Sequence, residues 1–264
     1  MKLTCQEGLI PGATLVDKWA TIQALGFDGI ELQGRGDFAF QKRLPELRAA
    51  REAGAVMPSV CVNMLHFIGD FDADKRRDAI ANMKSLLSTI AAVGGYGAVT
   101  LASFGMFSTR LPPFTPPRSP EEDRAVLLEG LHELGEHAAR EGVLVLLEPL
   151  NRYEDHMLNT VAQAAELTQA VGSHAVRVMG DLFHMSIEED DLDASIRADR
   201  AALAHIHLAD SNRLQPGTGH TDFAAALAAL REIGFTGSLA LECRLRGEPR
   251  KALAATASYL RGLM

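Results

Sequence analysis

The chain alternates short runs of Val, Ile and Leu with longer segments of helical period, and eight such units follow one another along its 264 residues. This alternation is typical of βαβ units, in which helices cover both faces of a parallel sheet. Most of the short runs are continuously apolar, as expected for strands that are buried on both sides. The predicted strands are 3–8, 29–33, 56–62, 98–103, 144–149, 177–181, 204–209 and 239–242.

Segments of helical period fill the spaces between these strands. The clearest predicted helices are 15–25, 75–93, 121–141, 161–171, 223–233 and 250–263. Several apolar helical stretches end at a glycine, a residue that readily takes the positive φ favoured just beyond a helix. These glycines are Gly26, Gly54, Gly142, Gly172 and Gly234.

Eight alternating units can close into a barrel or form an open, doubly wound sheet. The chain has no dinucleotide-type glycine turn after the first strand, which disfavours the open sheet. Its length also matches the roughly 250 residues that one closed (β/α)8 barrel needs. We therefore predict an α/β fold with a single TIM-barrel domain over residues 1–264.

Composition and charge limit the kinds of molecule that the chain is expected to bind. A content of 47% apolar and 23% charged residues is typical of a globular protein with a sizeable core. The net charge of -8 disfavours a basic nucleic-acid surface and favours a small ligand. We see neither an apolar signal region nor a run of about 18 apolar residues, so we expect a cytoplasmic protein without a membrane partner. The separated Cys5, Cys61 and Cys243 are expected to be reduced thiols.

The segment 104–120 is irregular because it contains five prolines, which exclude regular helix and central strand. It follows the fourth predicted strand, at the end of the barrel where active sites of this fold lie. The segment could be a lid or pocket wall, or a passive or oligomer-contact loop. The sequence leaves both interpretations open.

Four polar residues stand at or near the ends of the last four predicted strands. They are Glu148, Asp181, His207 and Glu242. In a closed barrel these positions converge at the mouth, where three carboxylates would repel one another unless a cation lies between them. This donor set suits Mn²⁺, Mg²⁺ or Co²⁺ better than a thiolate-rich zinc site, although Zn²⁺ also fits. The alternative is four separate residues that pair with nearby arginines or backbone.

Polar loops follow three of these residues and offer hydrogen-bonding groups to a polyhydroxylated ligand. Residues 149–160 follow Glu148, residues 182–189 follow Asp181, and residues 208–223 follow His207. We expect His184 to lie on a loop beside the metal, shortly after Asp181. Glu31 and His66, near the ends of the second and third strands, could line the pocket or have structural roles.

The blocks 147–154, 180–185, 205–213 and 241–242, with a weaker block at 26–32, resemble the sugar phosphate isomerase/epimerase superfamily of xylose-isomerase-like TIM barrels. Within it, the motifs are similar to those of the ketose 3-epimerases, such as tagatose and psicose 3-epimerase. The resemblance implies one divalent metal ion, first of all Mn²⁺, bound by Glu148, Asp181, His207 and Glu242. The implied substrate-binding residues are Glu154, His184 and Arg213.

The implied activity is a proton transfer beside a carbonyl group in carbohydrate metabolism. A metal ion that holds a carbonyl and a neighbouring hydroxyl would stabilise the enediolate formed when the carbon between them loses its proton. Glu148 and Glu242 would be the catalytic residues, one removing the proton and the other delivering one from the opposite side. We therefore expect an isomerase, either an epimerase or an aldose–ketose isomerase, and the family suggests a homodimer or homotetramer.

Three other functions remain open. The same groups could support a lyase or dehydratase that acts on a keto-sugar, a keto-inositol or a C-glycoside. A nuclease like endonuclease IV is disfavoured by the acidic charge and by the lack of an Asp-x-His pair between Asn212 and Gly219. A non-enzymatic sugar-binding protein would not need the complete set of proposed ligands.

Overall fold

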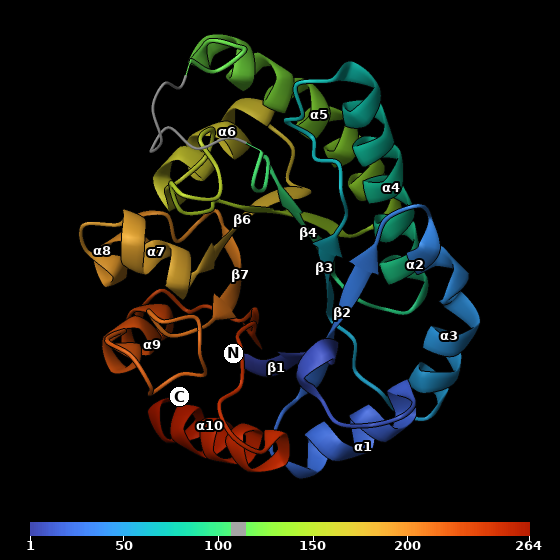
Figure 1. The fold of residues 1–264 in the computed structure, drawn as a ribbon, viewed down its shortest axis with the longest axis vertical. Helices are drawn as coiled ribbons and strands as arrows, with labels where there is room; N and C mark the ends of the chain where they lie inside the picture. Colours follow the sequence, from blue (N-terminus) through green and yellow to red (C-terminus); the bar gives the residue numbers. More distant parts are fainter. Residues whose placement is uncertain (107–114) are drawn as a thin grey trace.

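The computed structural model, which describes residues 1–106 and 115–264, is a closed barrel of eight parallel strands (Figure 1). Each strand pairs with the next, and β8 closes the barrel against β1, with Ser238 opposite Lys2. The predicted (β/α)8 barrel is thus confirmed, and so are all eight strands, with ends shifted by a few residues. The strands are β1 Lys2–Gln6, β2 Gly29–Arg35, β3 Ser59–Asn63, β4 Gly97–Leu101, β5 Leu144–Glu148, β6 Val176–Asp181, β7 Leu203–Leu208 and β8 Ser238–Leu241.

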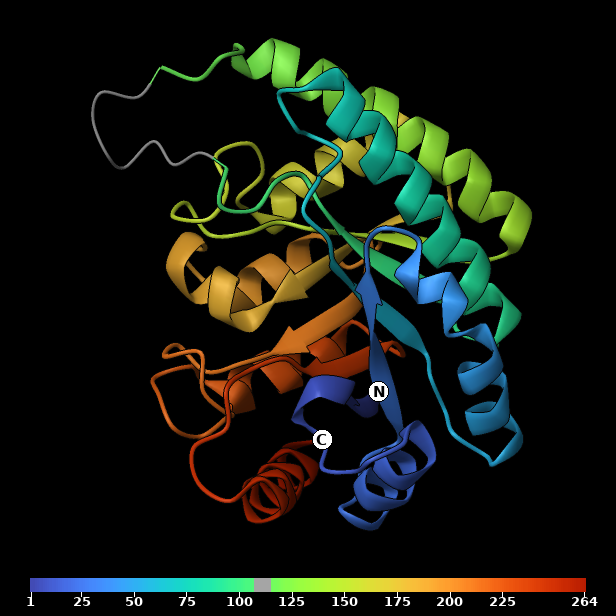
Figure 2. The same cartoon turned by 45° about the vertical axis from the view of Figure 1, so that its right-hand side comes forward.

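Helices surround the barrel, and α4 and α5 lie side by side on its outer surface (Figures 1 and 2). All six of these predicted helices are confirmed, and α3 is the helical stretch expected to end at Gly54, whereas the short helices α2, α7, α8 and η1 were not predicted. The helices are η1 Glu7–Leu9, α1 Leu15–Ala24, α2 Ala39–Lys42, α3 Leu44–Glu52, α4 Ala73–Ala92, α5 Pro120–Glu141, α6 Val161–Val171, α7 Leu182–Glu188, α8 Leu192–Ala198, α9 Phe223–Glu232 and α10 Pro249–Leu263.

Local sequence signals define several helix ends. Ser119 and Thr160 begin α5 and α6 with capping boxes, in which the cap hydroxyl and the side chain three residues later satisfy each other's backbone N–H groups. Gly142 and Gly172 end the same helices with φ of 70° and 69°. A residue with a Cβ would be strained in that conformation, so the expected helix stops are confirmed at these two positions.

The interior of the barrel has an apolar layer beneath a polar one. Cys61, Val99, Leu146 and Met179 form a small buried cluster separate from the main core between strands and helices. Each large apolar side chain that becomes fully buried stabilises the fold by about 1.5–3 kcal/mol. Side chains alternate along a strand, so Glu148 lies on the same face of β5 as Leu146 and points into the barrel mouth.

Two other expectations concern less regular parts of the chain. Much of the segment 104–120 lies outside the described residues, so the choice between a lid or pocket wall and a passive or oligomer-contact loop is not tested. No helix in residues 1–106 and 115–264 is long and apolar enough to cross a membrane.

Candidate metal and substrate site

Four side chains from neighbouring strands meet at the mouth of the barrel. Glu148 and Asp181 end β5 and β6, His207 is the penultimate residue of β7, and Glu242 directly follows β8. One potential ligand atom from each residue lies within 4.8 Å of the corresponding atoms of the other three. The structure therefore brings together the four residues that the sequence singled out.

His207 lies at the centre of this cluster. Its Nδ1 atom is 3.0 Å from Oε2 of Glu242 and 3.4 Å from Oε1 of Glu148. Among the described residues, neither ring nitrogen of His207 nor Oε1 of Glu148 has an aligned hydrogen-bond partner, although all three atoms are buried. Buried polar atoms are rarely left unpaired, and an ion is one common explanation. Three carboxylates and an imidazole with these unpaired atoms fit a divalent cation.

The side chains perturb one another's ionisation. Burial raises the pKa of Glu148. Burial also opposes ionisation of Glu242, but His207 and Arg213 hold its pKa well below the ordinary value. For His207, the carboxylates of Glu31, Glu242 and Glu148 outweigh burial and raise the pKa well above the usual range. The two catalytic candidates thus have opposite tendencies, Glu148 toward the protonated form and Glu242 toward the ionised form.

Arg213 partly neutralises the cluster. Its guanidinium donates to Oδ2 of Asp181 and, at 2.7 Å, to Oε2 of Glu242. It also lies over the ring of Phe183, 4.7 Å from the ring centroid. The structure therefore shows Arg213 paired with two proposed metal ligands, and its expected contact with substrate stays a prediction.

His184 lies beside the same cluster, in α7. The expectation that it lies on a loop was wrong, because α7 begins directly after β6, with the Asp181 side chain capping it through the N–H of Phe183 at 2.7 Å. The backbone N–H of Asn151 donates to Nδ1 of His184 at 3.1 Å. Nδ1 is therefore an acceptor, which leaves the proton of a neutral ring on Nε2, 3.8 Å from Oδ2 of Asp181.

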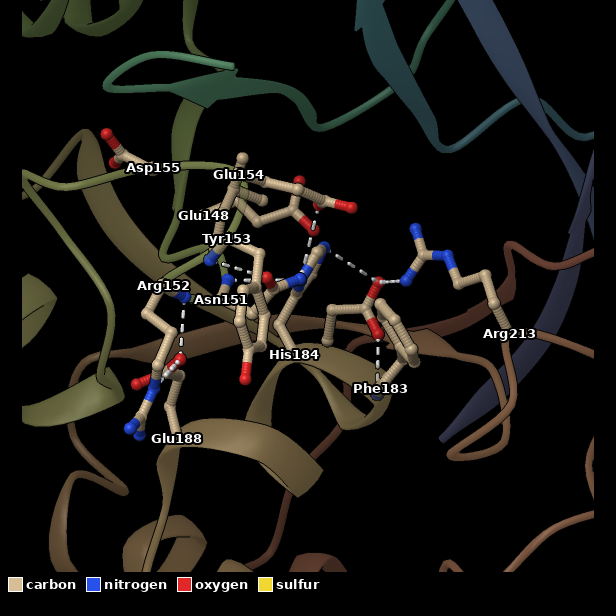
Figure 3. A network of polar contacts seen from close by, with 12 residues as sticks. Glu148, Asn151, Arg152, Tyr153, Glu154, Asp155, Phe183, His184, Glu188 and Arg213 are labelled. Atoms are coloured by element: carbon tan, nitrogen blue, oxygen red, sulfur yellow. Dashed lines mark hydrogen bonds and ion pairs between the residues drawn. The ribbon is translucent and has the colours of Figure 1, made fainter. Parts of the chain in front are cut away.

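Figure 3 shows Asn151 and Glu154, from the loop after β5, pointing toward His184. Oε2 of Glu154 lies 3.7 Å from Nδ1 of His184. Arg152 in the same loop pairs with Glu188 of α7 at 2.7 Å, which joins the loop to the helix. These contacts place a carboxylate and an imidazole side by side, where they could bind sugar hydroxyls.

Sequence reasoning missed the buried aspartates that shape two of the site loops. Asp155, fully buried, accepts hydrogen bonds from the Ser103 hydroxyl and from the backbone N–H groups of His156, Met157 and Leu158. The only sequence signal was an aspartate within a dense polar loop.

Asp210 has the same function in the loop after β7. Its carboxylate accepts from the backbone N–H groups of Ser211, Gly217, Thr218 and Thr221. Gly217 has a φ of 90°, a conformation that glycine adopts without strain. This loop carries Arg213, so Asp210 indirectly fixes the guanidinium beside Asp181 and Glu242.

A cavity of about 510 Å³ opens at this site. Its charged and polar lining includes the proposed catalytic and substrate-binding residues Glu148, Glu154, His184, Arg213 and Glu242. The other lining residues are mainly apolar: Cys61, Val62, Asn63, Met64, Leu65, Phe67, Leu101, Phe104 and Leu150. A ligand with both polar and apolar parts would match this lining.

The other two strand-end candidates, His66 and Glu31, contact neighbouring side chains of the protein. Nδ1 of His66 is 2.7 Å from Oδ2 of Asp78. Glu31 is fully buried, and its two carboxylate oxygens lie 2.9 Å from Nε2 of His205 and of His207. Burial disfavours ionisation of Glu31, but the two histidines hold its pKa below the ordinary value.

Comparison with known proteins shows which protein family the chain belongs to. The family model described as "Xylose isomerase-like TIM barrel" matches residues 19–263, and the chain belongs to this family. This confirms the resemblance inferred from the sequence blocks around the site.

Individual relatives are similar over most of the chain. The chain is 38% identical over 263 residues to 3-dehydro-D-guloside 4-epimerase of Escherichia coli strain K12, covering 99% of each. It is 33% identical over 230 residues to D-psicose 3-epimerase of Enterocloster bolteae, covering 84% of this chain and 74% of that protein. The apo crystal structure of E. coli 3-keto-D-glucoside 4-epimerase matches with a TM-score of 0.94 at 37% identity, covering 99% of each chain.

Proposed function

We propose that this protein is a carbohydrate epimerase that uses one divalent metal ion and inverts a carbon atom beside a carbonyl group. The observation that carries the proposal is the convergence of three carboxylates and one imidazole within 4.8 Å at a cavity. The expectation of an isomerase-class enzyme is confirmed by relatives that are epimerases and align over nearly the whole chain.

The named relatives share one chemical requirement. In a 3-keto-sugar, C4 lies beside the carbonyl carbon, and in a 2-ketose C3 does. A proton on such a carbon is acidified by the carbonyl, because its loss gives an enediolate. Inversion then needs one group that removes the proton from one face and a second group that delivers a proton to the other.

Glu242 and Glu148 suit these two roles. Both line the cavity, although their surroundings differ: His207 and Arg213 hold the pKa of Glu242 low, whereas burial raises the pKa of Glu148. A cation bound by both residues would favour the ionised form of each, so either carboxylate could accept the proton. A cation held by Glu148, Asp181, His207 and Glu242 would supply positive charge that stabilises the enediolate oxygens.

The remaining polar side chains would bind and orient the sugar. The Nε2–H of His184 can donate to a substrate oxygen, and Glu154 can accept from a hydroxyl group. Arg213, which faces the cavity from the loop after β7, can donate to an oxygen beside the reacting carbon.

The apolar lining residues favour a keto-glycoside over a free ketose. Leu65 and Phe104, at the rim of the cavity, are 88% and 51% exposed and could contact a group attached to the anomeric oxygen. A free ketose carries no such group. The similarity to the E. coli 4-epimerase over 99% of both chains also supports a keto-glycoside as the substrate.

A solvent-isotope experiment tests this function. The protein, stripped of metal and then supplied with Mn²⁺, would be incubated in D₂O with methyl 3-dehydroglucoside or with D-psicose, and the products followed by NMR. We expect inversion at C4 of the glycoside with deuterium at that carbon, and no turnover without a metal ion. Release of methanol by elimination would instead indicate the lyase, and absence of any exchange would contradict the proposal.

A further inference from the structure

A buried carboxylate lies directly beneath the proposed metal ligands. Oε1 of Glu31, in β2, is 2.9 Å from Nε2 of His207, and Oε2 is 2.9 Å from Nε2 of His205. All three side chains are fully buried in the interior of the barrel. Neither contact is aligned as a hydrogen bond, so the attraction is between the charge of the carboxylate and the two nearby rings.

Other side chains hold Glu31 in place. The Ser59 hydroxyl donates to Oε2 at 2.7 Å, and the Gln6 amide donates to Oε1 at 3.3 Å. The same amide donates to Oε1 of Glu242 at 2.9 Å. Glu31 is thus linked to the site by two routes, directly to His207 and through Gln6 to Glu242.

The two ring nitrogens of His207 face different groups. Nδ1 points toward Glu148 and Glu242, where a cation would lie, and Nε2 points toward Glu31. A nitrogen can bind a metal ion only through its lone pair, so the ring proton must then be on Nε2. A metal-bound histidine commonly directs its other N–H group to a carboxylate, which fixes the tautomer and the ring orientation.

His205 supports the same proton arrangement. Its Nδ1 atom lies 2.6 Å from the hydroxyl of Tyr96, and its Nε2 atom faces Glu31. If the Tyr96 hydroxyl donates to Nδ1, the ring proton of a neutral His205 is on Nε2. The N–H group of each of the two histidines would then lie 2.9 Å from one oxygen of Glu31, where the negative charge favours a proton on Nε2.

We propose that Glu31 is a positioning residue that holds His207 with its proton on Nε2 and leaves Nδ1 available to the metal ion. This inference rests on the proposed metal site. A competing arrangement exists, because Glu31, Cys61 and His207 also have potential ligand atoms within 4.8 Å of one another. In that arrangement Glu31 would itself bind a second cation, so the number of ions per chain separates the two roles.

The test is a calorimetric titration of metal-free protein with Mn²⁺, with folding checked by circular dichroism. We expect one ion per wild-type chain and binding weaker by about 10- to 100-fold in Glu31→Gln, the usual loss when the carboxylate partner of a metal-bound histidine is removed. Glu133→Gln is the control, because it also replaces a paired carboxylate, but one in the partly exposed ion pair with Lys84 and outside the site, and its affinity should stay within about threefold. Glu31→Asp, which keeps the charge, should recover part of the loss.

A second measurement does not depend on the variant folding. In ¹⁵N-histidine NMR spectra of wild-type protein loaded with diamagnetic Zn²⁺, His207 should carry its proton on Nε2. A folded Glu31→Gln variant with wild-type affinity, two ions per chain, or a proton on Nδ1 would each overturn the inference. Wild-type protein that binds no cation would instead overturn the proposed metal site itself.

Discussion

The carboxylates of Glu148 and Glu242 line the same cavity, but their burial and hydrogen-bond partners differ. Glu148 is 3% exposed, and its Oε1 atom lacks an aligned hydrogen-bond partner among the described residues. Glu242 accepts hydrogen bonds from Gln6 and Arg213. At the scale of single residues, burial thus raises the pKa of the Glu148 carboxyl, whereas positively charged and hydrogen-bonding neighbours keep the Glu242 carboxyl ionised.

We predict that Glu148→Gln and Glu242→Gln each abolish turnover, with near-native folding. An amide cannot transfer the proton, and loss of an acid or base typically costs at least about 100-fold in rate. The measurement is kcat on the keto-glycoside, with circular dichroism as the folding check. Glu133→Gln, at the half-exposed ion pair with Lys84, is the control and should retain full activity. Turnover close to wild type in either site variant would contradict the assigned roles.

At the scale of elements, two loops at the carboxyl ends of the strands depend on buried aspartates. Asp155 shapes the connection from β5 to α6, and Asp210 shapes the loop between β7 and α9. Each accepts several backbone N–H groups that would otherwise lack partners. Irregular backbone near a buried site needs such acceptors, because unpaired buried N–H groups are costly.

Asp155→Asn should destabilise the protein. In the wild type, both carboxylate oxygens of Asp155 accept backbone N–H groups. An asparagine has an NH₂ group in place of one oxygen, so one or more of these backbone N–H groups would lose its acceptor. The expected loss is about 1–3 kcal/mol of unfolding free energy. Urea denaturation of the two proteins would measure it, and an unchanged midpoint and slope would show that Asp155 does not order the loop.

Gly219→Ala should disturb the loop that carries Arg213. A Cβ atom at this position would lie 2.3 Å from Oδ1 of Asp210, whereas one at Gly262 in α10 would meet nothing within 4 Å. We expect a clear fall in kcat/KM for Gly219→Ala and none for the control Gly262→Ala. Equal kinetics in the two variants would mean that the geometry of this loop does not affect catalysis.

At the scale of the whole molecule, the site depends on closure of the barrel, because both ends of the chain contribute residues to it. Its proposed ligands come from the last four strands, but Gln6 and Glu31, which support them, come from β1 and β2. The pairing of β8 with β1 brings these two ends of the chain together. Folding of the first strands is therefore required for the geometry of the last ones.

We predict that residues 1–264 unfold as one cooperative domain, and that Mn²⁺ stabilises it. A ligand at 100 times its dissociation constant adds about 2.7 kcal/mol when it binds only the folded state. Differential scanning calorimetry should show one transition, raised by Mn²⁺ and lowered again by EDTA. Two separate transitions would contradict the single domain, and a melting temperature that does not respond to Mn²⁺ would contradict the metal site.

The sequence by itself determined the order of the eight strands, the six longer helices and the positions of Glu148, Asp181, His207 and Glu242. Strand and helix periodicity and a strand-end position are local properties of the chain, so they can be recognised without coordinates. The short helices α2, α7 and α8 were missed because helices of this length are marginal on their own and depend on packing.

Only the tertiary structure decided which side chains support the site. The contact of Glu31 with two histidines of β7 joins residues more than 170 positions apart, and no local pattern predicts such a pair. The same holds for Gln6 with Glu242, and no local pattern predicts the pairing of Arg213 with Asp181, 32 positions apart. These contacts arise because barrel closure places alternate residues of distant strands in one interior layer, where each polar group must find a partner.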